Sequence, residues 1–504
     1  MNYIVVSGGV ISGLGKGVTT SSIGVILQDC GFDVTAIKID PYINVDAGTM
    51  SPYEHGECYV LDDGSETDLD LGCYERFLNL SLTGDNSITT GKVYQKLLEK
   101  ERRGDFLGKT VQIIPHFTNL VKDMIKTASR EITLIELGGT IGDIEGLPFV
   151  EALRQFGCDN KNTCFIHLSY IPFLETTMEE KTKPTQHSIQ HLRSLGITPD
   201  ILVMRGKTLS DSTKKKLSFF CQIPEENIFL NPDLPSIYQV PHLFLEQGIL
   251  TPVLSKLGLE IPRLPDMEWW NTIHKTPSKT VKIAIAGKYT GLKDSYISII
   301  RALEHASFHN KIELELIWVD TDMEKLKEAD GILVPGGFGY RGIDEMIVAS
   351  KYTRDHKIPY LGICLGMQVL CIDIARHLFD MQNANSTEFD KDTPHDVIVL
   401  QDDIDKENMG GTMRLGLKDV DINKDSLSYQ YYGKETVKER FRHRYTLNSD
   451  YIAKFSKYLH ISKDIIEVKS HPFCVGVQFH PEFLSRHATP HPIINGFVEK
   501  SIQK

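Results

Sequence analysis

Two stretches of the sequence carry side chains that could do chemistry, and they lie far apart along the chain. The first, "SGGVISGLGKG" (residues 7–17), combines several glycines with Lys16. The second, "GICLGMQ" (residues 362–368), places Cys364 in a G-x-C-x-G pattern after an apolar run. A glycine-rich turn with a lysine is typical of phosphate binding, and a cysteine in a sharp strand-to-helix turn is typical of a nucleophile. The chain therefore combines the residue types of a nucleotide site and of a thiol enzyme.

The glycine-rich stretch differs from the common phosphate-binding loop at one position. The common pattern ends in Gly-Lys-Ser/Thr, whose hydroxyl ligates Mg²⁺, whereas Lys16 is followed here by Gly17. We still expect backbone N–H groups at a helix start to face a phosphate, with Lys16 supplying positive charge. An ordinary glycine-rich turn is the alternative, and the lysine within G-L-G-K-G disfavours it. If the loop binds a triphosphate, carboxylates must replace the missing hydroxyl.

Several charged residues are candidates for that replacement. Asp70, in "ETDLDLG", and Glu136, in "LIELGG", are expected at the ends of apolar strands. A carboxylate there is costly unless it is paired or binds a metal, and Mg²⁺ prefers oxygen ligands. Lys38 and Asp40 also close an expected strand, and Lys38 could stabilise a transferring phosphoryl group. An ordinary cap or ion pair is the alternative for each carboxylate.

The cysteine needs a general base, and the C-terminal region supplies one. His480, in "VGVQFHPEF", directly follows an expected strand, and Glu482 is close enough to orient its imidazole. A position at the start of a helix favours the thiolate of Cys364. Gly336 and Gly337, in "LVPGGFG", could donate N–H groups to an oxyanion. A lone histidine is usually structural, but the cysteine, histidine and carboxylate together predict a nucleophilic centre.

Short β-branched runs alternate with helical patterns in both halves of the chain, which predicts parallel sheets flanked by helices. We expect an α/β fold with two Rossmann-like doubly wound domains, an N-terminal domain with the P-loop over residues 1–265 and a C-terminal domain with the cysteine centre over 281–504. Residues 266–280 are rich in proline and polar residues, so we expect a linker there. The expected strands are "YIVVSG", "DVTAIKI", "EITLIEL", "CFIHLSY", "DILVMR", "VKIAIAG", "LELIWV", "GILVPGG" and "IPYLGIC".

Composition limits the class of protein. The chain of 504 residues is long enough for two or three domains, and its 41% hydrophobic and 24% charged residues are those of a globular protein. A net charge of −12 argues against a general nucleic-acid or membrane surface. No run approaches the roughly 20 apolar residues of a membrane span, and the N-terminus lacks a signal-peptide pattern. Nine cysteines without a C-x-x-C pair favour reduced thiols, so we expect a cytoplasmic protein with neither nucleic acid nor membrane as partner.

These motifs together resemble those of the CTP synthase family over nearly the whole chain, from about Asn2 to Val498. The resemblance implies a P-loop synthetase domain over 1–265 and a glutaminase domain over 281–504. The implied enzyme is a ligase that phosphorylates O4 of UTP with ATP and then displaces the phosphate with ammonia from glutamine. The implied products are CTP, ADP, phosphate and glutamate. The matching stretches, in family order, are "GGVISGLGKG", "KIDPYINVDAGTMSPYEHGE", "KERRGDFLGKTVQIIPH", "GGTIGDIEGLPF", "KTKPTQHS", "PGGFGYRG", "GICLGMQ", "NANSTEF", "GGTMRLG", "RFRHRY" and "VGVQFHPEF".

The resemblance also implies roles for individual residues. The implied catalytic residues are Cys364, His480 and Glu482 for glutamine hydrolysis and Lys16 and Lys38 for phosphoryl transfer. The implied oxyanion and glutamine-binding residues are Gly337, Leu365, Gly366, Met367, Gln368, Glu388 and Arg444. The implied ATP-binding residues are Gly13, Leu14, Gly15, Lys16, Gly17, Val18, Asp70, Arg205 and Asp233. The implied UTP- or CTP-binding residues are Ser12, Asp143, Ile144, Glu145, Lys181, Thr182, Lys183, Pro184, Thr185, Gln186 and Lys216. The implied metal ligands are Asp70 and Glu136.

Further ligands and partners follow from the resemblance. It implies Mg²⁺ as cofactor, ATP as co-substrate, and GTP as an allosteric activator near the loop that contains Arg341. CTP is the implied feedback inhibitor, and the implied assembly is a homotetramer with an internal ammonia channel, with filaments as an open further state. Two alternative functions are also compatible with the sequence. One is glutamine-dependent amidation of another acceptor, as in cobyrinic acid amidation, and the other is a nucleotide-sensing filament protein with degenerate catalysis.

Overall fold

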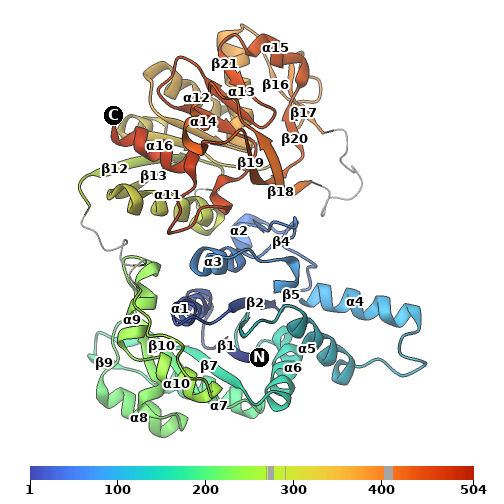
Figure 1. Ribbon diagram of the computed structural model, residues 1–504, viewed down its shortest axis with the longest axis vertical. Coiled ribbons are helices and arrows are strands. Elements are labelled where there is room, and N and C mark those ends of the chain that lie inside the picture. The colour runs from blue at the N-terminus through green and yellow to red at the C-terminus, as the bar shows by residue number, and fades with distance from the viewer. Residues whose placement is uncertain (268–269, 271–276, 290, 402–412) are drawn as a thin grey trace. The chain divides into compact units, whose positions relative to one another are not determined.

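The protein is described by a computed structural model that covers residues 1–267, 270, 277–289, 291–401 and 413–504. The chain divides into two compact units (Figure 1). The first unit comprises Met1–Asp46 and Cys73–Ile273, and the second comprises Ala47–Gly72 and His274–Lys504. Much of the expected linker at 266–280 lies outside the described residues. Within those residues, no helix combines the length and apolar character that crossing a bilayer needs.

A seven-stranded parallel sheet forms the centre of the first unit. Its strands follow the spatial order β11-β10-β7-β1-β6-β2-β5, and each neighbouring pair is parallel. The strand order reverses beside β1, and such a reversal places a binding crevice at the carboxyl ends of the strands. The strands are β1 (Asn2–Gly8), β2 (Val34–Asp40), β5 (Ser87–Thr89), β6 (Ile132–Leu137), β7 (Thr163–Tyr170), β10 (Ile201–Arg205) and β11 (Ile228–Asn231).

Helices cover both faces of this sheet, which is why β1, β2 and β6 are buried along their whole length. On one face, α4, α5 and α6 pack through Val93, Val121 and Phe149. The helices are α1 (Lys16–Asp29), α4 (Thr90–Arg103), α5 (Thr118–Thr127), α6 (Leu147–Asp159), α7 (Lys183–Ser194), α8 (Asp211–Cys221), α9 (Val240–Glu246) and α10 (Leu250–Leu257). A short hairpin of β8 (Phe173–Leu174) and β9 (Glu179–Glu180) precedes α7.

The second unit contains a seven-stranded mixed sheet in the order β13-β12-β14-β15-β23-β22-β21. The strands from β13 to β23 are parallel, as expected, whereas β22 and β21 form an antiparallel edge. That edge is an addition to the doubly wound pattern that the sequence predicted. The strands are β12 (Thr280–Ala286), β13 (Glu313–Val319), β14 (Gly331–Val334), β15 (Tyr360–Ile363), β21 (Leu459–Ile461), β22 (Ile465–Val468) and β23 (Cys474–Val477).

Two helical layers cover the second sheet and confirm the predicted α/β class. One core contains residues of α12 and α13, including Met346 and Leu370, and the other contains residues of α11 and α16, including Leu303 and Phe497. The helices are α11 (Ile297–Asn310), α12 (Ile343–His356), α13 (Leu365–Leu378), α14 (Leu427–Tyr432), α15 (Ile452–Phe455) and α16 (Pro492–Ile502). The remaining strands are β16 (Asn385–Ser386), β17 (Asp396–Leu400) and β20 (Tyr445–Leu447) in one small sheet, and β18 (Arg414–Asp421) and β19 (Thr436–His443) in a hairpin.

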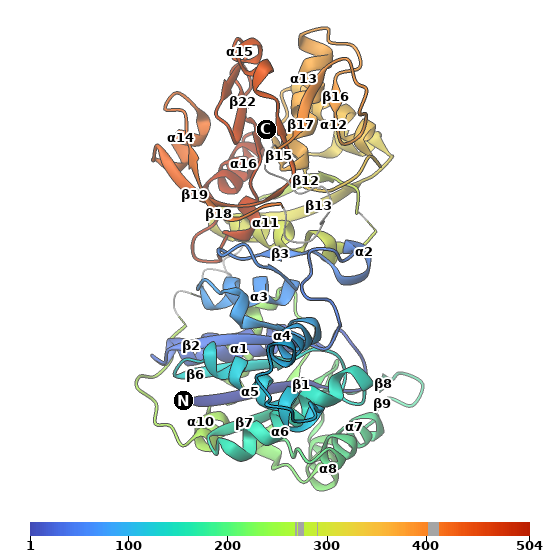
Figure 2. The same cartoon turned by 90° about the vertical axis from the view of Figure 1, so that its right-hand side faces the viewer.

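The segment Ala47–Gly72 belongs to the second unit, although it lies near the N-terminus in sequence. We call it the inserted segment. It holds α2 (Pro52–His55) and the strands β3 (Tyr59–Val60) and β4 (Glu66–Thr67), and it runs beside the β18–β19 hairpin (Figures 1 and 2). The Tyr59 hydroxyl donates to the carbonyl oxygen of Phe483 at 2.9 Å, and Arg442 Nε donates to Glu66 Oε1 at 2.7 Å. The compact division therefore differs from the continuous boundary expected at residue 265.

Three buried histidines make the stability of the protein depend on pH. Burial lowers the pKa of His167 and of His443 to about 3 and that of His487 to about 4, all below the ordinary value of 6.5. Between these values and 6.5 the unfolded chain binds more protons than the native state does. Stability therefore falls as the pH falls through this window and is fully present above it.

We expect the free energy of unfolding, measured in urea, to decrease by about 1.4 kcal/mol per pH unit for each such histidine below about pH 6. His167→Gln removes one titrating group, so the pH dependence becomes less steep by that amount. His187→Gln, on the exposed side of α7, is the matched control and leaves the slope unchanged. An identical slope in the unmodified protein and in His167→Gln would contradict this account.

Candidate functional site

Cys364 occupies a sharp turn between β15 and α13 in the second unit. Its backbone has a φ of 51° and a ψ of −98°, a combination that a residue with a side chain rarely adopts. The neighbouring glycines are needed, because a Cβ on Gly366 would lie 2.1 Å from the carbonyl oxygen of Val334. A Cβ on Gly362 would lie 2.6 Å from the backbone of Gly366. The G-x-C-x-G pattern therefore forms the predicted nucleophile elbow, with the sulfur at the N-terminus of α13.

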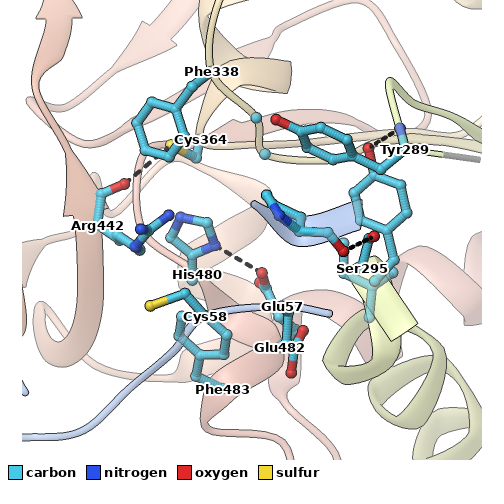
Figure 3. Close-up of a pocket in the computed structure, with 15 residues that line it drawn as sticks. Glu57, Cys58, Tyr289, Ser295, Phe338, Cys364, Arg442, His480, Glu482 and Phe483 are labelled. Carbon is cyan, nitrogen blue, oxygen red and sulfur yellow. Dashed lines mark hydrogen bonds and ion pairs between the residues drawn. The ribbon is translucent and has the colours of Figure 1, made fainter. Parts of the chain in front are cut away.

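His480 and Glu482 lie beside this cysteine (Figure 3). The distance from His480 Nδ1 to Glu482 Oε1 is 2.7 Å, and both side chains are buried. Gly336 lies next to both His480 and Cys364. A Cβ on this glycine would lie 3.0 Å from His480 Cε1 and 3.6 Å from Cys364 Cβ. The structure thus brings together the three residues that the sequence predicted as a triad.

The charge balance around His480 favours its protonated form. Burial by itself would lower the pKa of His480, but the negative charges of Glu482 and Cys364 outweigh burial and raise that pKa to about 10. An imidazole with this property can take the thiol proton of Cys364 and hold it next to the resulting thiolate. Glu482 fixes the tautomer, since its oxygen accepts the Nδ1 proton and leaves Nε2 for proton transfer.

The predicted oxyanion donors also meet at the elbow. Leu365 is the first residue of α13, so its N–H has no acceptor within the helix. Gly337 lies across from it, because a Cβ there would be 3.4 Å from Leu365 Cδ2. Gly366 and Met367 continue the first turn of α13 and are buried. Two backbone N–H groups can therefore face the position where an oxyanion would form.

Two of the three residues predicted to hold glutamine contact the loop that follows β14, and the third, Gln368, lies in α13. Glu388 accepts a hydrogen bond from the N–H of Gly339 at 2.9 Å, and burial raises the pKa of its carboxyl group. The guanidinium of Arg444 lies 5.7 Å from the ring centre of Phe338. Gln368 Nε2 donates to the carbonyl oxygen of Tyr445 at 2.9 Å.

A cavity opens beside the triad, and part of its lining was missed by sequence reasoning. Cys364, His480 and Phe338 line it from the sheet side (Figure 3). The inserted segment contributes Pro52, Glu57 and Cys58. Glu57 is held in place because its Oε2 accepts a hydrogen bond from the N–H of Ser298 at 3.0 Å. The stretch "SPYEHGE" was recognised in the sequence as a motif, but a single sequence carries no signal that it faces the cysteine.

The loop containing Arg341 also contacts the inserted segment. Arg341 donates to the carbonyl oxygen of Lys288 at 2.8 Å and to the hydroxyl of Tyr53. Burial lowers the pKa of Lys288 to about 8, and its Nζ donates to the carbonyl oxygen of Phe338 at 3.3 Å. The loop of residues 335–342, which carries both Phe338 and Arg341, is therefore joined to Lys288 and to the inserted segment by hydrogen bonds within the second unit.

In the first unit, the glycine-rich loop follows β1 at the carboxyl edge of the sheet. α1 begins at Lys16, and Gly13 and Gly15 have φ values of 73° and 81°, which only glycine adopts without strain. Lys16 Nζ donates to the carbonyl oxygen of Gly139 at 2.9 Å, which joins the loop to the turn after β6. The predicted strand, glycine turn and helix are confirmed, and the N–H groups of α1 are available to an anion at this edge.

A buried ion-pair cluster lies near the C-terminal ends of the neighbouring strands β2 and β6. Lys38 Nζ lies 3.2 Å from Glu136 Oε1 and 3.6 Å from Asp40 Oδ1, and Tyr74 donates to Glu136. Carboxylate oxygens of this kind fit Mg²⁺. The described residues contain no group of three or more Asp, Glu, His or Cys side chains that could hold a metal by themselves. A magnesium ion here would therefore need phosphate oxygens as further ligands, as it usually does in nucleotide sites.

Asp70 is not at the end of a strand, contrary to the expectation from the sequence. It lies in the first turn of α3 (Leu69–Leu78), a helix that spans the boundary between the two units. The carboxylate of Asp68 accepts the N–H of Asp70 at 3.0 Å and starts the helix, which ends the extended run after only two strand residues in β4. Asp70 itself belongs to the second unit.

Residues 181–186 of the set predicted to bind UTP or CTP lie around the start of α7, which follows β7 and the β8–β9 hairpin. Gln186 Nε2 donates to Thr182 Oγ1 at 3.0 Å, and Ser169 Oγ donates to Thr185 Oγ1 at 3.1 Å. These buried contacts fix α7 against the sheet, while Pro184 occupies its first turn. Three further members of the predicted set, Ser12, Lys183 and Lys216, are exposed, and Lys181 forms an ion pair with Glu179.

Two other predicted groups lie on loops at the same edge. The carboxylate of Asp143 accepts the N–H of Thr140 at 2.8 Å, and the side chains of Ile144 and Glu145 are exposed. Arg205 closes β10, donates to the carbonyl oxygen of Asn231 at 2.8 Å and pairs with Asp233. The carboxyl edge thus gathers the predicted residues of the first unit.

A buried histidine that the sequence did not single out lies under this edge. His167 Nδ1 is 3.0 Å from Ser7 Oγ, and its Nε2 is 2.8 Å from Ser188 Oγ. This chain of contacts joins the end of β1 to α7, which are the elements that carry the two predicted nucleotide-binding loops. A histidine inside the apolar run "CFIHLSY" was the available signal.

The elbow, the paired histidine and carboxylate, and the glycine-rich loop define a glutamine-dependent amidotransferase joined to a nucleotide-binding synthetase. Comparisons with known proteins agree. Residues 2–259 match the family described as CTP synthase N-terminus, and residues 291–500 match glutamine amidotransferase class-I. The chain belongs to the CTP synthase family, whose members are glutamine-hydrolysing carbon–nitrogen ligases that use nucleotides.

The relatives match over almost their full length. The chain is 47% identical over 532 residues to the CTP synthase of Thermus thermophilus, covering 99% of this chain and 96% of that protein. It is 48% identical over 523 residues to the CTP synthase of Methanosarcina mazei, covering 99% and 98%. It is 46% identical over 527 residues to the CTP synthase of Thermococcus kodakarensis, covering 100% and 99%.

Proposed function

We propose that this chain makes CTP from UTP, ATP and glutamine, with glutamine hydrolysis in the second unit and amination in the first. The observation that carries the proposal is that each unit presents its own reactive set within a chain that matches CTP synthases from end to end. The second unit brings together Cys364, His480 and Glu482, and the first carries the glycine-rich loop and the Lys38–Glu136 pair on strands of one parallel sheet.

Glutamine hydrolysis begins at the elbow. The Cys364 sulfur attacks the side-chain carbonyl carbon of glutamine, and His480 takes the thiol proton. The resulting oxyanion accepts hydrogen bonds from the N–H groups of Gly337 and Leu365. His480 then gives its proton to the leaving nitrogen, so that ammonia departs and a thioester remains, which water hydrolyses to glutamate. Gln368, Glu388 and Arg444 hold the substrate, with Gly366 and Met367 shaping the turn.

Amination proceeds in two steps at the carboxyl edge of the first unit. ATP transfers its γ-phosphate to O4 of UTP, which converts a poor leaving group into a good one, and ammonia then displaces the phosphate at C4. Lys16 and Lys38 neutralise the charge that develops on the moving phosphoryl group. The N–H groups of residues 13–18 bind the ATP phosphates.

A magnesium ion would supply further charge neutralisation for the ATP phosphates in this site. We propose Asp70 and Glu136, the carboxylates that the family resemblance implies, as its protein ligands. The carboxylate of Glu136 is already held by Lys38 and Tyr74, so it is pre-oriented for such a role. These carboxylates take the place of the hydroxyl that the glycine-rich loop lacks.

The remaining nucleotide contacts are assigned to the surrounding loops. We propose Arg205 and Asp233 for the adenine end of ATP. The proposed UTP- or CTP-binding residues are Ser12, Asp143, Ile144, Glu145, Lys181, Thr182, Lys183, Pro184, Thr185, Gln186 and Lys216. We also propose CTP as feedback inhibitor, GTP as activator near Arg341, a homotetramer, and a cytoplasmic location, the last supported by nine cysteines that form no disulfide in the structure.

The experiment is a product assay. Purified protein with UTP, ATP, Mg²⁺ and glutamine is expected to yield CTP, ADP, phosphate and glutamate in equal amounts by chromatography. No CTP is expected when UTP is omitted. CTP is also expected when ammonium chloride at alkaline pH is supplied in place of glutamine. Absence of CTP with both nitrogen donors would overturn the proposal and would favour an acceptor other than UTP or a binding protein with inactive sites.

A further inference from the structure

Gln478 lies directly beside the proposed nucleophile. It follows β23, and its side chain is fully buried. Its backbone N–H donates to the carbonyl oxygen of Asp464 at 2.9 Å, which fixes the chain two residues before His480. Its side-chain nitrogen, Nε2, donates to Cys364 Sγ at 3.6 Å. A buried amide donor is therefore aimed at the sulfur that must act as a thiolate.

The orientation of this amide is set by Gln368 on α13. Gln368 Nε2 donates to the carbonyl oxygen of Tyr445 at 2.9 Å and to Gln478 Oε1 at 3.4 Å. The oxygen of Gln478 must then face Gln368, which leaves its NH₂ group for Cys364. The reverse orientation would set two NH₂ groups against each other and an oxygen against the sulfur, at a high cost in a buried site.

The other neighbour of the sulfur makes this donor important. Cys364 Sγ lies 3.7 Å from the carbonyl oxygen of Arg442, which can accept the thiol proton but repels the thiolate (Figure 3). An N–H donor does the opposite, because a hydrogen bond strengthens when its acceptor becomes charged. Loss of the proton from Cys364 therefore weakens the contact with Arg442 and strengthens the contact with Gln478.

We infer that Gln478 is a further catalytic residue of the glutaminase, which donates a hydrogen bond to the Cys364 thiolate and holds the sulfur for attack on glutamine. The inference rests on the proposed role of Cys364 as nucleophile. It also connects the nucleophile to a proposed substrate-binding residue, since Gln368 contacts the same amide that stabilises the thiolate.

The test is alkylation of Cys364 by iodoacetamide, in which the thiolate sulfur bonds to the methylene carbon and iodide leaves. Gln478→Met keeps the side-chain volume and removes the donor. We expect labelling of the Cys364 peptide at pH 7, followed by mass spectrometry, to slow about tenfold, and kcat/KM for glutamine to fall about ten- to hundredfold. The midpoint of the pH dependence of labelling shifts to higher pH, while the rate of CTP formation from ammonia is unchanged.

A second variant separates this role from packing. Gln478→Glu introduces a side chain of nearly the same shape as glutamine. One of its carboxylate oxygens accepts a hydrogen bond from Gln368, and the other faces the Cys364 sulfur as an acceptor in place of the N–H donor. We expect slower labelling than in Gln478→Met, whereas Gln503→Met at the end of α16 behaves as the unmodified protein. Unchanged labelling rates and pH profiles in both Gln478 variants would overturn the inference, whatever happens to glutamine hydrolysis. Failure of the proposed function is distinguishable, because CTP would then be absent with either nitrogen donor in the unmodified protein.

Discussion

Cys364→Ala is expected to abolish glutamine-driven CTP formation and to leave ammonia-driven CTP formation close to that of the unmodified protein. Loss of a catalytic nucleophile costs about 10⁴-fold or more in turnover, because neither His480 nor the oxyanion donors can replace the covalent step. External ammonia bypasses that step, and the two lysines proposed to stabilise phosphoryl transfer, Lys16 and Lys38, belong to the first unit. Both rates are measured as CTP formed per minute, with glutamine in one series and ammonium chloride at alkaline pH in the other.

Cys371→Ala is the matched control for this experiment. Cys371 lies seven residues further on in α13 and is fully buried, and burial raises the pKa of its thiol to about 12. Such a thiol is a packing group rather than a nucleophile, so its loss affects stability and leaves both activities. Equal loss of the two activities in Cys364→Ala would show that the roles of the two units have been separated incorrectly.

The elbow illustrates what the sequence alone could predict. The glycines of "GICLGMQ" are required by close backbone approaches. Cys364 directly follows β15, and His480 and Glu482 come shortly after β23. These are local features, so a pattern of a few residues reveals them. The nine expected strands are confirmed for a related reason, since each contains a short run rich in apolar and β-branched residues, although β13 is only partly buried.

Several of the strands that sequence reasoning missed are short or lie at an edge. β5 has three residues and β11 has four, too few for a periodic pattern. β21 and β22 form an antiparallel edge whose partner cannot be read from either segment. Asp70 was placed on a strand because its neighbours look extended, but the Asp68 side chain starts a helix there.

The largest difference concerns the inserted segment Ala47–Gly72. Its contacts with the glutaminase join residues that are far apart in the sequence, such as Tyr59 and Phe483, which are 424 positions apart. No local sequence pattern predicts such a contact. Charged pairs such as Arg442 with Glu66 are individually unremarkable in sequence and become informative only when the fold brings them together. The segment therefore places residues from the N-terminal region in the cavity of a C-terminal thiol.

This arrangement gives the glutaminase cavity a boundary that the glutaminase sequence alone does not supply. Glu57 and Cys58 line the cavity with Cys364 and His480, and Tyr53 contacts Arg341 of the neighbouring loop. A change in the position of the inserted segment would therefore alter the surroundings of the nucleophile directly. Such a change would also alter the contacts of loop 335–342, because Phe338 and Arg341 of this loop both form hydrogen bonds with Lys288.

Lys16→Ala is expected to abolish CTP formation from both nitrogen donors. Lys16 lies at the first position of α1, and its Nζ reaches the turn after β6, so its charge lies where ATP phosphates would meet the helix N-terminus. Removing a positively charged group that stabilises phosphoryl transfer costs about 10²- to 10³-fold or more in rate. The measurement is CTP formation at saturating UTP, once with glutamine and once with ammonia.

Lys161→Ala is the control, since Lys161 is exposed and precedes β7 at the amino edge of the same sheet, away from the glycine-rich loop. Labelling of Cys364 by iodoacetamide should be unchanged in Lys16→Ala, because that thiol and its partners belong to the second unit. Normal CTP formation from ammonia in Lys16→Ala would contradict the placement of phosphoryl transfer at this loop. A loss confined to the glutamine series would instead assign Lys16 to the supply of ammonia, so the two series together decide which half of the reaction the lysine serves.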